Sequence, residues 1–575
     1  MKNYFTPFVA LCRESKYANL CLASIFAFTI FLQCCLFHYL AFQSILISSL
    51  WNNPLAFWSF YLPKLSIALF IASFVFLFKS KLWTIVISIL INMWILAEFI
   101  YFRANRIFLD AHSFTLIGNL DGFWSSVPMY LQWIDALWLL PTIIAIFAYF
   151  LFKNYRTNNS SFILSIIISF MMNTSGCLGV YYQWKNVSSL PLPEKSINPL
   201  NDAFCFTNGI YIKNMSVIHA FIYNLKNLCL IPFEKKSYTM SDEDFKQAML
   251  FVNQSNKKVT PSNHLILILV ESLETWAIRP DITPNLYRFI QNHNVIWSHK
   301  VISQTRGGTS SDGQLIFNTG LLPIQKGAVC KRYHQNQYPA LSSIFSTSVL
   351  IQPGDLEVWN QKYMSDAYKI DTNYLSPQNL DHYTFELLDD IYRKYPFIML
   401  ATMATHSPFE SCANYTYIEL PSDMPRKMAN YLRCLHYSDS CWGDFLLKID
   451  TDSILKNTII CFQGDHIIFD SNMRNEFEQY CLEKNLDYDV QNNNTAFIAY
   501  APNLQEKTII SEKTYQMDAY STILQLIDCE KYYWKGFGVN ILDSTARRNR
   551  LISEQEAFFL SDKIIRANWF ETLEQ

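Results

Sequence analysis

Three apolar runs in the second half of the chain each end in an acidic or imidazole side chain. The runs cover 264–271, 396–406 and 458–466. The side chains that close them are Glu271, His406 and the pair Asp465 and His466. Short continuous apolar runs are typical of buried strands in a parallel sheet. Because ligands of open α/β sheets bind outside the carboxyl ends of the strands, we expect these four side chains to converge at one edge.

A hydroxyl-rich turn, Gly307-Gly-Thr-Ser-Ser-Asp312, lies between the first two runs and leads into an apolar segment. We expect a helix to begin here, whose free N–H groups favour an anion. Carboxylates, imidazoles and an activated hydroxyl are the groups that a metal-assisted phosphoryl or sulfuryl transfer site needs. Taken singly, each acid or histidine has an ordinary structural explanation, such as a surface acid or a core histidine. Their joint placement at strand ends favours a site.

The elements that must position these residues alternate along the chain from about residue 262. Strands are predicted at 264–271, 295–303, 347–352, 396–403, 457–462 and 495–501. Helices are predicted at 283–293, 310–320, 338–346, 382–394, 423–449 and 515–527. This alternation favours an α/β domain whose mostly parallel sheet is flanked by helices on both faces.

The first third of the chain is too apolar for a soluble domain. Hydrophobic residues make up 51% of the whole chain and charged residues 16%, and the apolar excess lies before residue 182. Five stretches are long enough to span a bilayer, which takes about 20 residues. They cover roughly 18–40, 60–78, 82–102, 132–152 and 160–181. The first is too long for a cleaved signal peptide and lacks a small-residue cleavage site, so we interpret it as an anchor.

Basic residues predict the orientation of these spans. Three groups fall on one side, which should be the cytoplasm: Lys2, Arg13, Lys16, Lys79, Lys81, Lys153 and Arg156. An odd number of spans then puts the rest of the chain outside. We therefore expect a transmembrane domain at 1–182, a linker with juxtamembrane helices at 183–260, and an extracytoplasmic catalytic domain at 261–575. Within the linker, 208–232 resembles an amphipathic helix, and Ser241 begins a second helix.

Two features near the outer ends of the spans have alternative explanations. Arg103 and Arg106 follow the third span, where they would either snorkel to lipid phosphates or hold the anionic head of a lipid substrate. Tryptophans near the span ends suggest an interfacial belt: Trp51, Trp58, Trp124, Trp133 and Trp138.

Charge and cysteine content exclude other classes of protein. The formal net charge is −2 and no basic cluster or reader motif occurs, so no nucleic-acid partner is expected. Fourteen cysteines occur without CxxC or zinc-finger spacing, which favours scattered buried thiols. In an exported domain, a Cys434–Cys441 or Cys412–Cys434 bridge is the alternative.

Together these motifs resemble a known family. Five motifs behind five spans resemble the lipoteichoic-acid-synthase and phosphoethanolamine-transferase branch of the alkaline phosphatase/sulfatase superfamily. In chain order they are Glu271-Ser-Leu-Glu-Thr-Trp, Thr283-Pro-Asn-Leu, Gly308-Thr-Ser-Ser-Asp-Gly-Gln, Thr405-His-Ser-Pro-Phe and Gly464-Asp-His. The resemblance covers roughly 262–545 and implies an alkaline-phosphatase-like fold for that domain. No single motif is decisive, but five in the same order are strong evidence together.

The resemblance implies one divalent metal ion, with Mn²⁺ preferred over Zn²⁺ or Mg²⁺. Its ligands would be Glu271, the nucleophilic hydroxyl, Asp465 and His466, and such a donor set suits these metals. The family pattern Gly-x-Thr-Ser-Asp leaves the nucleophile open. A gapless match gives the role to Ser310, whereas the family's usual residue type gives it to Thr309. We favour Ser310 slightly.

The resemblance also implies substrate-binding residues. His406 matches a histidine that contacts the substrate phosphate or the leaving group. Trp359 matches the tryptophan of the family's glycerophosphate pocket. Around that tryptophan, lipoteichoic-acid synthases have a histidine and an arginine where this chain has Gln352 and Gln361. Two cationic groups are lost, which puts glycerophosphate polymerisation in doubt, although glutamines still hydrogen-bond a polar head.

We therefore predict a membrane-bound transferase. It would move a phospholipid head group, of phosphoglycerol or phosphoethanolamine type, through a covalent phospho-enzyme to an envelope glycan or lipid acceptor. The predicted location is the bacterial cytoplasmic membrane, with a periplasmic or extracellular catalytic domain. One alternative is an extracytoplasmic phosphodiesterase or sulfatase, although the Cys/Ser-x-Pro-x-Arg pattern of formylglycine sulfatases is missing after Thr309 and Ser310. Another is a non-catalytic assembly protein, which would be expected to lose metal ligands.

Overall fold

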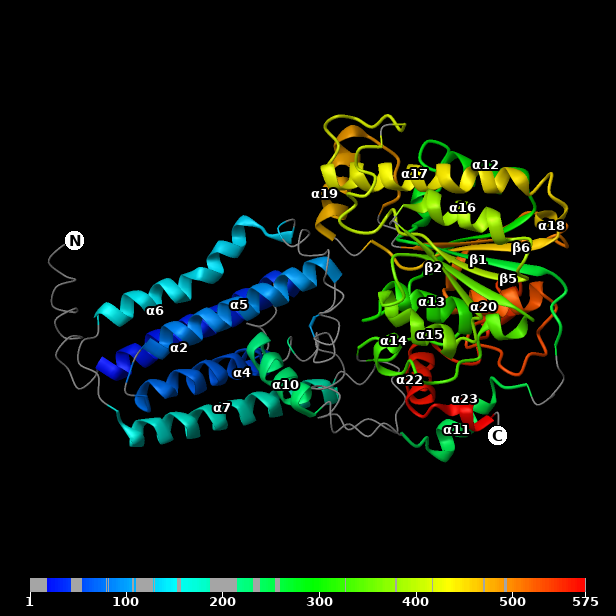
Figure 1. The fold of residues 1–575 in the computed structure, drawn as a ribbon. Helices are drawn as coiled ribbons and strands as arrows, with labels where there is room; N and C mark the ends of the chain where they lie inside the picture. The colour runs from blue at the N-terminus through cyan, green and yellow to red at the C-terminus, as the bar shows by residue number, and fades with distance from the viewer. Residues whose placement is uncertain are drawn as a thin grey trace. The chain divides into compact units, whose positions relative to one another are not determined.

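The chain folds into two compact units: the described residues up to 230 form the first, and those from 238 onward form the second (Figure 1). The computed structural model describes residues 18–42, 54–78, 80, 82–105, 108–109, 128, 130–151, 157–186, 212, 215–230, 238–253, 259–325, 327–377, 380–415, 417–468, 471–490 and 494–573. The basic residues that predict the orientation lie outside these ranges, as do Arg106, Trp51 and Trp124.

The N-terminal unit is built from long apolar helices. These are α2 (Ala18–Phe42), α4 (Pro54–Ser73), α5 (Leu82–Asn105), the continuous pair η4 (Trp133–Leu139) and α6 (Leu140–Leu151), and α7 (Asn159–Asn186). Five of the described segments are long and apolar enough to cross a membrane, and their ends lie within two residues of the predicted spans. The prediction of five spans is confirmed in that sense.

Small residues let two of these helices approach closely. A Cβ added to Gly176 on α7 would lie 2.7 Å from Pro63 of α4, and one added to Gly179 would lie 2.7 Å from Ser59. Ser169 on α7 also donates a hydrogen bond to the carbonyl of Ser66 on α4, at 2.6 Å. Glycine and serine at such a contact are typical of helices packed in lipid, where close backbone approach supplies the van der Waals energy.

The contacts of Arg103 match neither of its two predicted roles, which were snorkelling to lipid phosphates and binding of a lipid head group. Its guanidinium is buried and makes two hydrogen bonds to the carboxylate of Asp135, at 2.7 and 2.9 Å, and a third to the carbonyl of Tyr130. This bidentate arginine–carboxylate pair neutralises the Arg103 charge inside the bundle, so the guanidinium does not depend on lipid phosphates for a partner.

The tryptophans separate into two groups. Trp133 is 98% exposed and Trp58 is 56% exposed, as expected for an interfacial belt. Trp138 is 1% exposed and packs on Phe37 and Phe99, so the prediction that it lies at the interface is wrong. Its position on the inner face of η4 buries it in the bundle.

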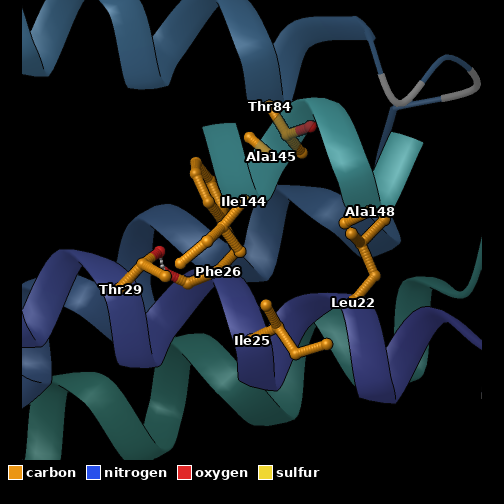
Figure 2. Close-up of a pocket in the computed structure, with 8 residues that line it drawn as sticks. All are labelled: Leu22, Ile25, Phe26, Thr29, Thr84, Ile144, Ala145 and Ala148. Atoms are coloured by element: carbon orange, nitrogen blue, oxygen red, sulfur yellow. Dashed lines mark hydrogen bonds between the residues drawn. The ribbon is translucent and has the colours of Figure 1, made fainter. Parts of the chain in front are cut away.

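Figure 2 shows a small pocket between α2, α5 and α6. Apart from Thr29 and Thr84, its lining is apolar, and the Thr29 hydroxyl donates to the carbonyl of Phe26 on the same helix. A pocket without a titratable or metal-binding side chain has no chemistry of the kind expected above.

Two shorter helices lie in the segment expected to be a linker. Helix α10 (Val217–Leu230) belongs to the N-terminal unit, and α11 (Asp242–Met249) belongs to the C-terminal unit. Ser241 caps α11 by accepting a hydrogen bond from the Asp244 amide, as the sequence predicts. Lys563 pairs with Asp244 at 2.7 Å and holds α11 on helix α22 (Glu554–Arg566).

The C-terminal unit contains one mixed sheet of eight strands in the order β4-β3-β5-β1-β6-β7-β2-β8. Its strands are β1 (His264–Val270), β2 (Val295–Ile302), β3 (Ser348–Pro353), β4 (Thr372–Ser376), β5 (Phe397–Ala401), β6 (Thr458–Gly464), β7 (Thr495–Tyr500) and β8 (Thr508–Tyr515). Only β7 runs against its neighbours, so a mostly parallel sheet is confirmed. The strands β4 and β8 were not predicted, since both are half-exposed edge strands without a continuous apolar run.

Helices cover both faces of the sheet (Figure 1). One face packs on α12 (Pro284–Asn292), α16 (Asp381–Ile391), α17 (Arg426–Lys448) and α19 (Ser471–Lys484). The other packs on α13 (Ser310–Thr319), α15 (Gln361–Ala367), α20 (Met517–Leu526), α22 (Glu554–Arg566) and α23 (Trp569–Leu573). Alternate residues of β1 enter the two cores, which is why the whole strand is apolar.

The remaining elements are short. They are α14 (Val329–Arg332), α18 (Ser453–Lys456), α21 (Ser544–Arg548), η1 (Phe74–Phe76), η6 (Thr275–Ala277), η7 (Leu341–Ile344) and η8 (Val358–Asn360). The helix predicted at 338–346 is wrong, because only the single 3-10 turn η7 forms there. Pro339 lies at the start of that segment and restricts the residue before it to extended backbone.

Candidate metal centre and nucleophile

The carboxyl ends of β1 and β6 bring three ligand-type side chains together. The two strands pair in parallel, with Val270 opposite Gly464, so Glu271 and Asp465 leave the sheet side by side. One ligand atom each from Glu271, Asp465 and His466 lies within 4.8 Å of the others, and all three side chains are buried. Two carboxylates and an imidazole in one buried cluster are a donor set that fits a divalent cation.

Hydrogen bonds from neighbouring loops fix the Glu271 peptide. Its N–H donates to the Thr402 hydroxyl at 3.0 Å, and its carbonyl accepts from the Thr405 hydroxyl at 2.5 Å. Both threonines follow β5, the other neighbour of β1 in the sheet. Ser272 donates from its hydroxyl to the Glu271 carboxylate at 2.8 Å.

The Asp465 carboxylate is held by two backbone amides. Its Oδ1 accepts from the N–H of Ser272 at 2.8 Å and from that of His466 at 2.7 Å. The His466 ring Nδ1 lies 2.9 Å from the carbonyl of Ile467, which leaves Nε2 facing the carboxylates. That Nε2 is 3.5 Å from Glu271 Oε1 and 3.4 Å from Asp465 Oδ2.

Ser310 places its hydroxyl in this cluster. Its Oγ donates to Glu271 Oε2 at 3.1 Å and lies 3.2 Å from His466 Nε2. Ser310 is the first residue of α13, so the hydroxyl lies at the N-terminus of a helix. Helix α13 packs so closely on the ligand loop that a Cβ added to Gly313 would lie 2.9 Å from the Asp465 carbonyl.

Thr309 lies one residue outside the helix. Its backbone has a positive φ of 47°, and its side chain makes no capping hydrogen bond to α13. Within the described ranges, the only side-chain hydroxyl that hydrogen-bonds to the Glu271–His466 pair from this turn is that of Ser310. The one-residue step into the helix therefore aims the two hydroxyls differently.

The turn before α13 is built around Asp312. Its Oδ2 accepts from the amides of Arg306 and Gly308, both at 2.9 Å. A Cβ on Gly308 would lie 2.2 Å from Asp312 Oδ1, so only glycine fits there. Burial raises the pKa of Asp312 to about 7, although the two amides and the Arg306 charge oppose the shift.

Burial and mutual repulsion control the charge of the cluster. Burial, with the nearby Glu271 carboxylate as a second cause, raises the pKa of Asp465 to about 7, although His466 opposes the shift. Burial alone would lower the pKa of His466, but Asp465 and Glu271 outweigh it and raise that pKa. A cation among these groups would relieve the repulsion between the two carboxylates.

His406 lies in the loop after β5. Its Nδ1 is 2.6 Å from the carbonyl of Ser407. Burial lowers the pKa of His406, and the charge of His466 lowers it further, so the imidazole is neutral near pH 7. The residue before it, Thr405, donates its hydroxyl to the Glu271 carbonyl, so His406 lies beside the candidate cluster.

The three residues expected around a substrate pocket lie in the β3–α15 segment. Trp359 has a positive φ of 54° and is half-buried. Gln352 donates from Nε2 to the carbonyl of Asp355, and Gln361 donates to the hydroxyl of Ser365. The side-chain oxygen of each glutamine is buried without a hydrogen-bond partner among the described residues.

A chain of contacts links this segment to helix α13, which carries the candidate hydroxyl. The Asn360 amide donates to the carbonyl of Cys330 at 2.7 Å, and the Cys330 thiol lies 3.4 Å from the hydroxyl of Ser311. Residue 311 directly follows Ser310, so the Trp359 segment and the hydroxyl turn belong to one packed region.

Gln516 supports the candidate site, although no feature of the sequence singles it out. Its buried Nε2 donates to the carbonyls of Gly464 and Asp465, at 2.9 and 2.7 Å. Its Oε1 accepts from the amide of Gln304 at 2.6 Å. One side chain thus joins the loop of the candidate ligands Asp465 and His466 to the end of β2, and no spacing or motif marks it.

Glu274 and Arg474 provide a second support that sequence reasoning missed. They form a buried ion pair, and the Glu274 carboxylate also accepts from the amide of Ile468, two residues after His466. The indole N–H of Trp276 donates to the same carboxylate at 2.6 Å. The Glu274–Arg474 pair therefore holds the loop that follows the candidate ligands Asp465 and His466.

The cysteines of this unit form no disulfide among the described residues. Cys412 and Cys434 are both buried free thiols. The Cys434 thiol also donates to the carbonyl of Phe409 at 3.6 Å.

Comparisons with known proteins agree with this architecture. Residues 1–185 match the family model described as lipoteichoic acid synthase N-terminal domain, and residues 323–529 match the one described as sulfatase. The second match includes His406, Asp465 and His466 but not Glu271 or Ser310.

Individual proteins are similar over most of the chain. The lipoteichoic acid synthase of Staphylococcus aureus (strain USA300) is 21% identical over 518 residues, which cover 83% of this chain and 78% of that protein. The lipooligosaccharide phosphoethanolamine transferase A of Neisseria meningitidis has a similar fold, with a TM-score of 0.50, 11% identity, and coverage of 88% of this chain and 95% of the other. The structure of the lipoteichoic acid synthase LtaP from Listeria monocytogenes has a TM-score of 0.45 and 17% identity, and covers 53% of this chain and 82% of its own.

Proposed function

Because this chain belongs to the alkaline phosphatase/sulfatase superfamily and is homologous to lipoteichoic acid synthase, we propose that it is a membrane-bound, metal-dependent transferase of phospholipid head groups. The observation that carries the proposal is the Ser310 hydroxyl, hydrogen-bonded to Glu271 and next to His466 at the start of a helix. The head group would be of phosphoglycerol or phosphoethanolamine type, and the acceptor an envelope glycan or lipid.

We propose Glu271, Asp465, His466 and the Ser310 oxygen as the ligands of one divalent metal ion. Carboxylate, imidazole and hydroxyl oxygen suit Mn²⁺, and they suit Zn²⁺ and Mg²⁺ as well. Such an ion would lower the pKa of the hydroxyl and neutralise charge on the transferring phosphoryl group. The free N–H groups at the start of α13 favour the same anionic phosphate.

In the proposed reaction, the Ser310 oxygen attacks the phosphorus of the donor lipid. The bond between phosphorus and the diacylglycerol oxygen breaks, diacylglycerol takes up a proton, and the head group remains on Ser310 as a phosphodiester. An acceptor hydroxyl then attacks the same phosphorus, the bond to Ser310 breaks, and the serine regains a proton. The neutral His406 is suited to hydrogen-bond the phosphate or the leaving oxygen.

Trp359, Gln352 and Gln361 are the proposed contacts for the head group. The buried side-chain oxygens of the glutamines accept hydrogen bonds, which suits a head group that carries N–H or O–H donors. We place the protein in the bacterial cytoplasmic membrane with this unit outside the cell, since five spans follow a basic N-terminal segment.

Intact mass spectrometry of the full-length protein with its phospholipids tests the proposal. We expect an adduct with the mass of a head-group phosphate on the wild type and on Thr309→Ala, but not on Ser310→Ala. An adduct that disappears with Thr309→Ala and persists with Ser310→Ala would move the nucleophile by one residue. Retained turnover in the double variant would refute the covalent mechanism, and release of free head-group phosphate without an acceptor would favour hydrolysis.

A further inference from the structure

Asp381 carries a buried carboxylate that the proposed reaction does not use. It is the first residue of α16 and is 0% exposed. An acid in the first turn ordinarily stabilises its own helix, whose first N–H groups lack acceptors. Among the described residues, however, the three hydrogen bonds of the Asp381 carboxylate all go to groups outside α16.

Two of these hydrogen bonds hold the turn that follows β5. Asp381 Oδ1 accepts from the amide of Met403 at 2.8 Å and from the amide of Ala404 at 3.1 Å. The Met403 carbonyl in turn accepts from the amide of His406 at 3.0 Å. One carboxylate oxygen thus fixes the turn that carries His406, the histidine proposed to contact the transferring phosphate.

The same turn also holds Glu271. Thr402 and Thr405 flank the two amides that Asp381 fixes, and both threonine side chains are buried. The Thr402 hydroxyl accepts from the Glu271 amide at 3.0 Å, and the Thr405 hydroxyl donates to the Glu271 carbonyl at 2.5 Å. A shift of the turn would therefore move Glu271 and His406 together.

Helix α17 holds the other oxygen of the carboxylate. The buried Ser438 donates its hydroxyl to Asp381 Oδ2 at 2.6 Å, so both oxygens of the carboxylate are engaged. On the next residue of α16, His382 Nδ1 lies 2.6 Å from the hydroxyl of Tyr437, which precedes Ser438 on α17. Among the described residues this second pair makes no side-chain hydrogen bond to the turn 402–406.

We propose that Asp381 is a positioning residue for the candidate centre, which fixes Glu271 and His406 through the turn 402–406. The role requires an oxygen that accepts from two amides, and the side chain of asparagine supplies such an oxygen as well. The inference rests on the proposed function for the roles of Glu271 and His406. The hydrogen bonds that join these residues to Asp381 do not depend on it.

Hydrogen–deuterium exchange of the full-length protein in detergent tests the link without any reaction. Ser438→Ala and Tyr437→Phe are a matched pair, because each removes one hydroxyl of α17 that contacts α16. We expect Asp381→Ala, and to a smaller degree Ser438→Ala, to speed exchange in peptides that cover 402–406 and 270–273. Asp381→Asn and Tyr437→Phe should exchange like the wild type there. Unchanged exchange in Asp381→Ala, or equal acceleration in Tyr437→Phe, would overturn the proposal.

Two further measurements show whether the link matters to the centre. Isothermal calorimetry should show that Asp381→Ala raises the Kd for Mn²⁺ by about ten-fold or more, as for other residues that support a ligand. With phosphatidylglycerol or phosphatidylethanolamine at saturation, the head-group adduct on Ser310 should form roughly a hundred-fold more slowly. Asp381→Asn should restore both values. A lower Tm with the Kd and this rate unchanged would assign Asp381 a purely structural role and overturn the proposal.

The inference and the proposed function fail in different ways. If the wild type binds no Mn²⁺ and forms no adduct, the proposed function is wrong, and the exchange experiment still decides whether Asp381 holds the turn. If the wild type does both and Asp381→Ala matches it, the positioning role is wrong and the proposed function stands. Where Asp381→Ala does not fold, Ser438→Ala against Tyr437→Phe makes the same comparison.

Discussion

Replacing Gln516 by methionine should loosen the candidate metal centre from outside the ligand set. Methionine has a similar length but cannot hydrogen-bond as an amide does. The change leaves three buried groups without their partner: the carbonyls of Gly464 and Asp465 and the amide of Gln304. Each such loss costs about 1–3 kcal/mol, so we expect a total destabilisation of roughly 3–6 kcal/mol after partial relaxation.

The same change should weaken metal binding, because Gln516 holds the peptide of Asp465, a proposed ligand. Partners of this kind typically contribute ten- to a hundred-fold in metal affinity. We expect the Kd for Mn²⁺ to rise by about that factor, equivalent to roughly 1.4–2.8 kcal/mol. Isothermal calorimetry of the solubilised full-length protein measures the Kd, and scanning fluorimetry measures the loss of Tm.

Gln479→Met is the matched control, since Gln479 is exposed on α19 and its one side-chain hydrogen bond among the described residues is to Glu483. It should leave both the Tm and the Kd unchanged. If Gln516→Met lowers the Tm but binds Mn²⁺ like the wild type, Gln516 stabilises the fold without positioning the ligand. If neither quantity changes, the reasoning from buried hydrogen bonds is wrong.

Three further predictions concern the ligands, their charge and the orientation of the chain. Glu271→Ala, Asp465→Ala and His466→Ala should each abolish stoichiometric metal while the fold is retained; wild-type metal content by elemental analysis would refute the assignment. The raised pKa of Asp465 means that the metal-free folded state binds more protons than the unfolded state between pH 4 and 7. Metal-free protein should therefore lose stability, up to about 4 kcal/mol, as the pH rises through that window. Unfolding measured at several pH values should show a smaller loss for Asp465→Asn. The same dependence of unfolding free energy on pH in the variant and the wild type would contradict the argument. A phosphatase fused after Gln575 should be active, and a cytoplasmic signal would reverse the predicted topology.

The sequence by itself determined the elements with a strong local pattern. The five spans follow from apolar runs of membrane length, and six strands follow from short apolar or alternating runs. Strand β1 is apolar throughout because helices cover both faces of its sheet, which is why its run was easy to recognise. The half-exposed edge strands β4 and β8 lack that pattern and were missed.

The sequence also indicated which residues could form a site, since Glu271, Asp465 and His466 follow apolar runs. It could not measure how close they come, because that depends on the register between β1 and β6, which lie almost 200 residues apart. The family pattern left Thr309 and Ser310 as alternatives. The backbone of the turn brings the Ser310 hydroxyl to Glu271, since one step along a helix start redirects the side chain.

Only the tertiary structure could select residues whose partners are distant in the chain. Gln516 contacts Gly464 and Gln304, 52 and 212 residues away, through an ordinary side chain with no motif. Arg103 is paired with Asp135 across two helices, which no span prediction contains. The physical reason is the same in each case: local pattern reports the environment of a segment, whereas a hydrogen bond or ion pair depends on which segments the packed fold brings together.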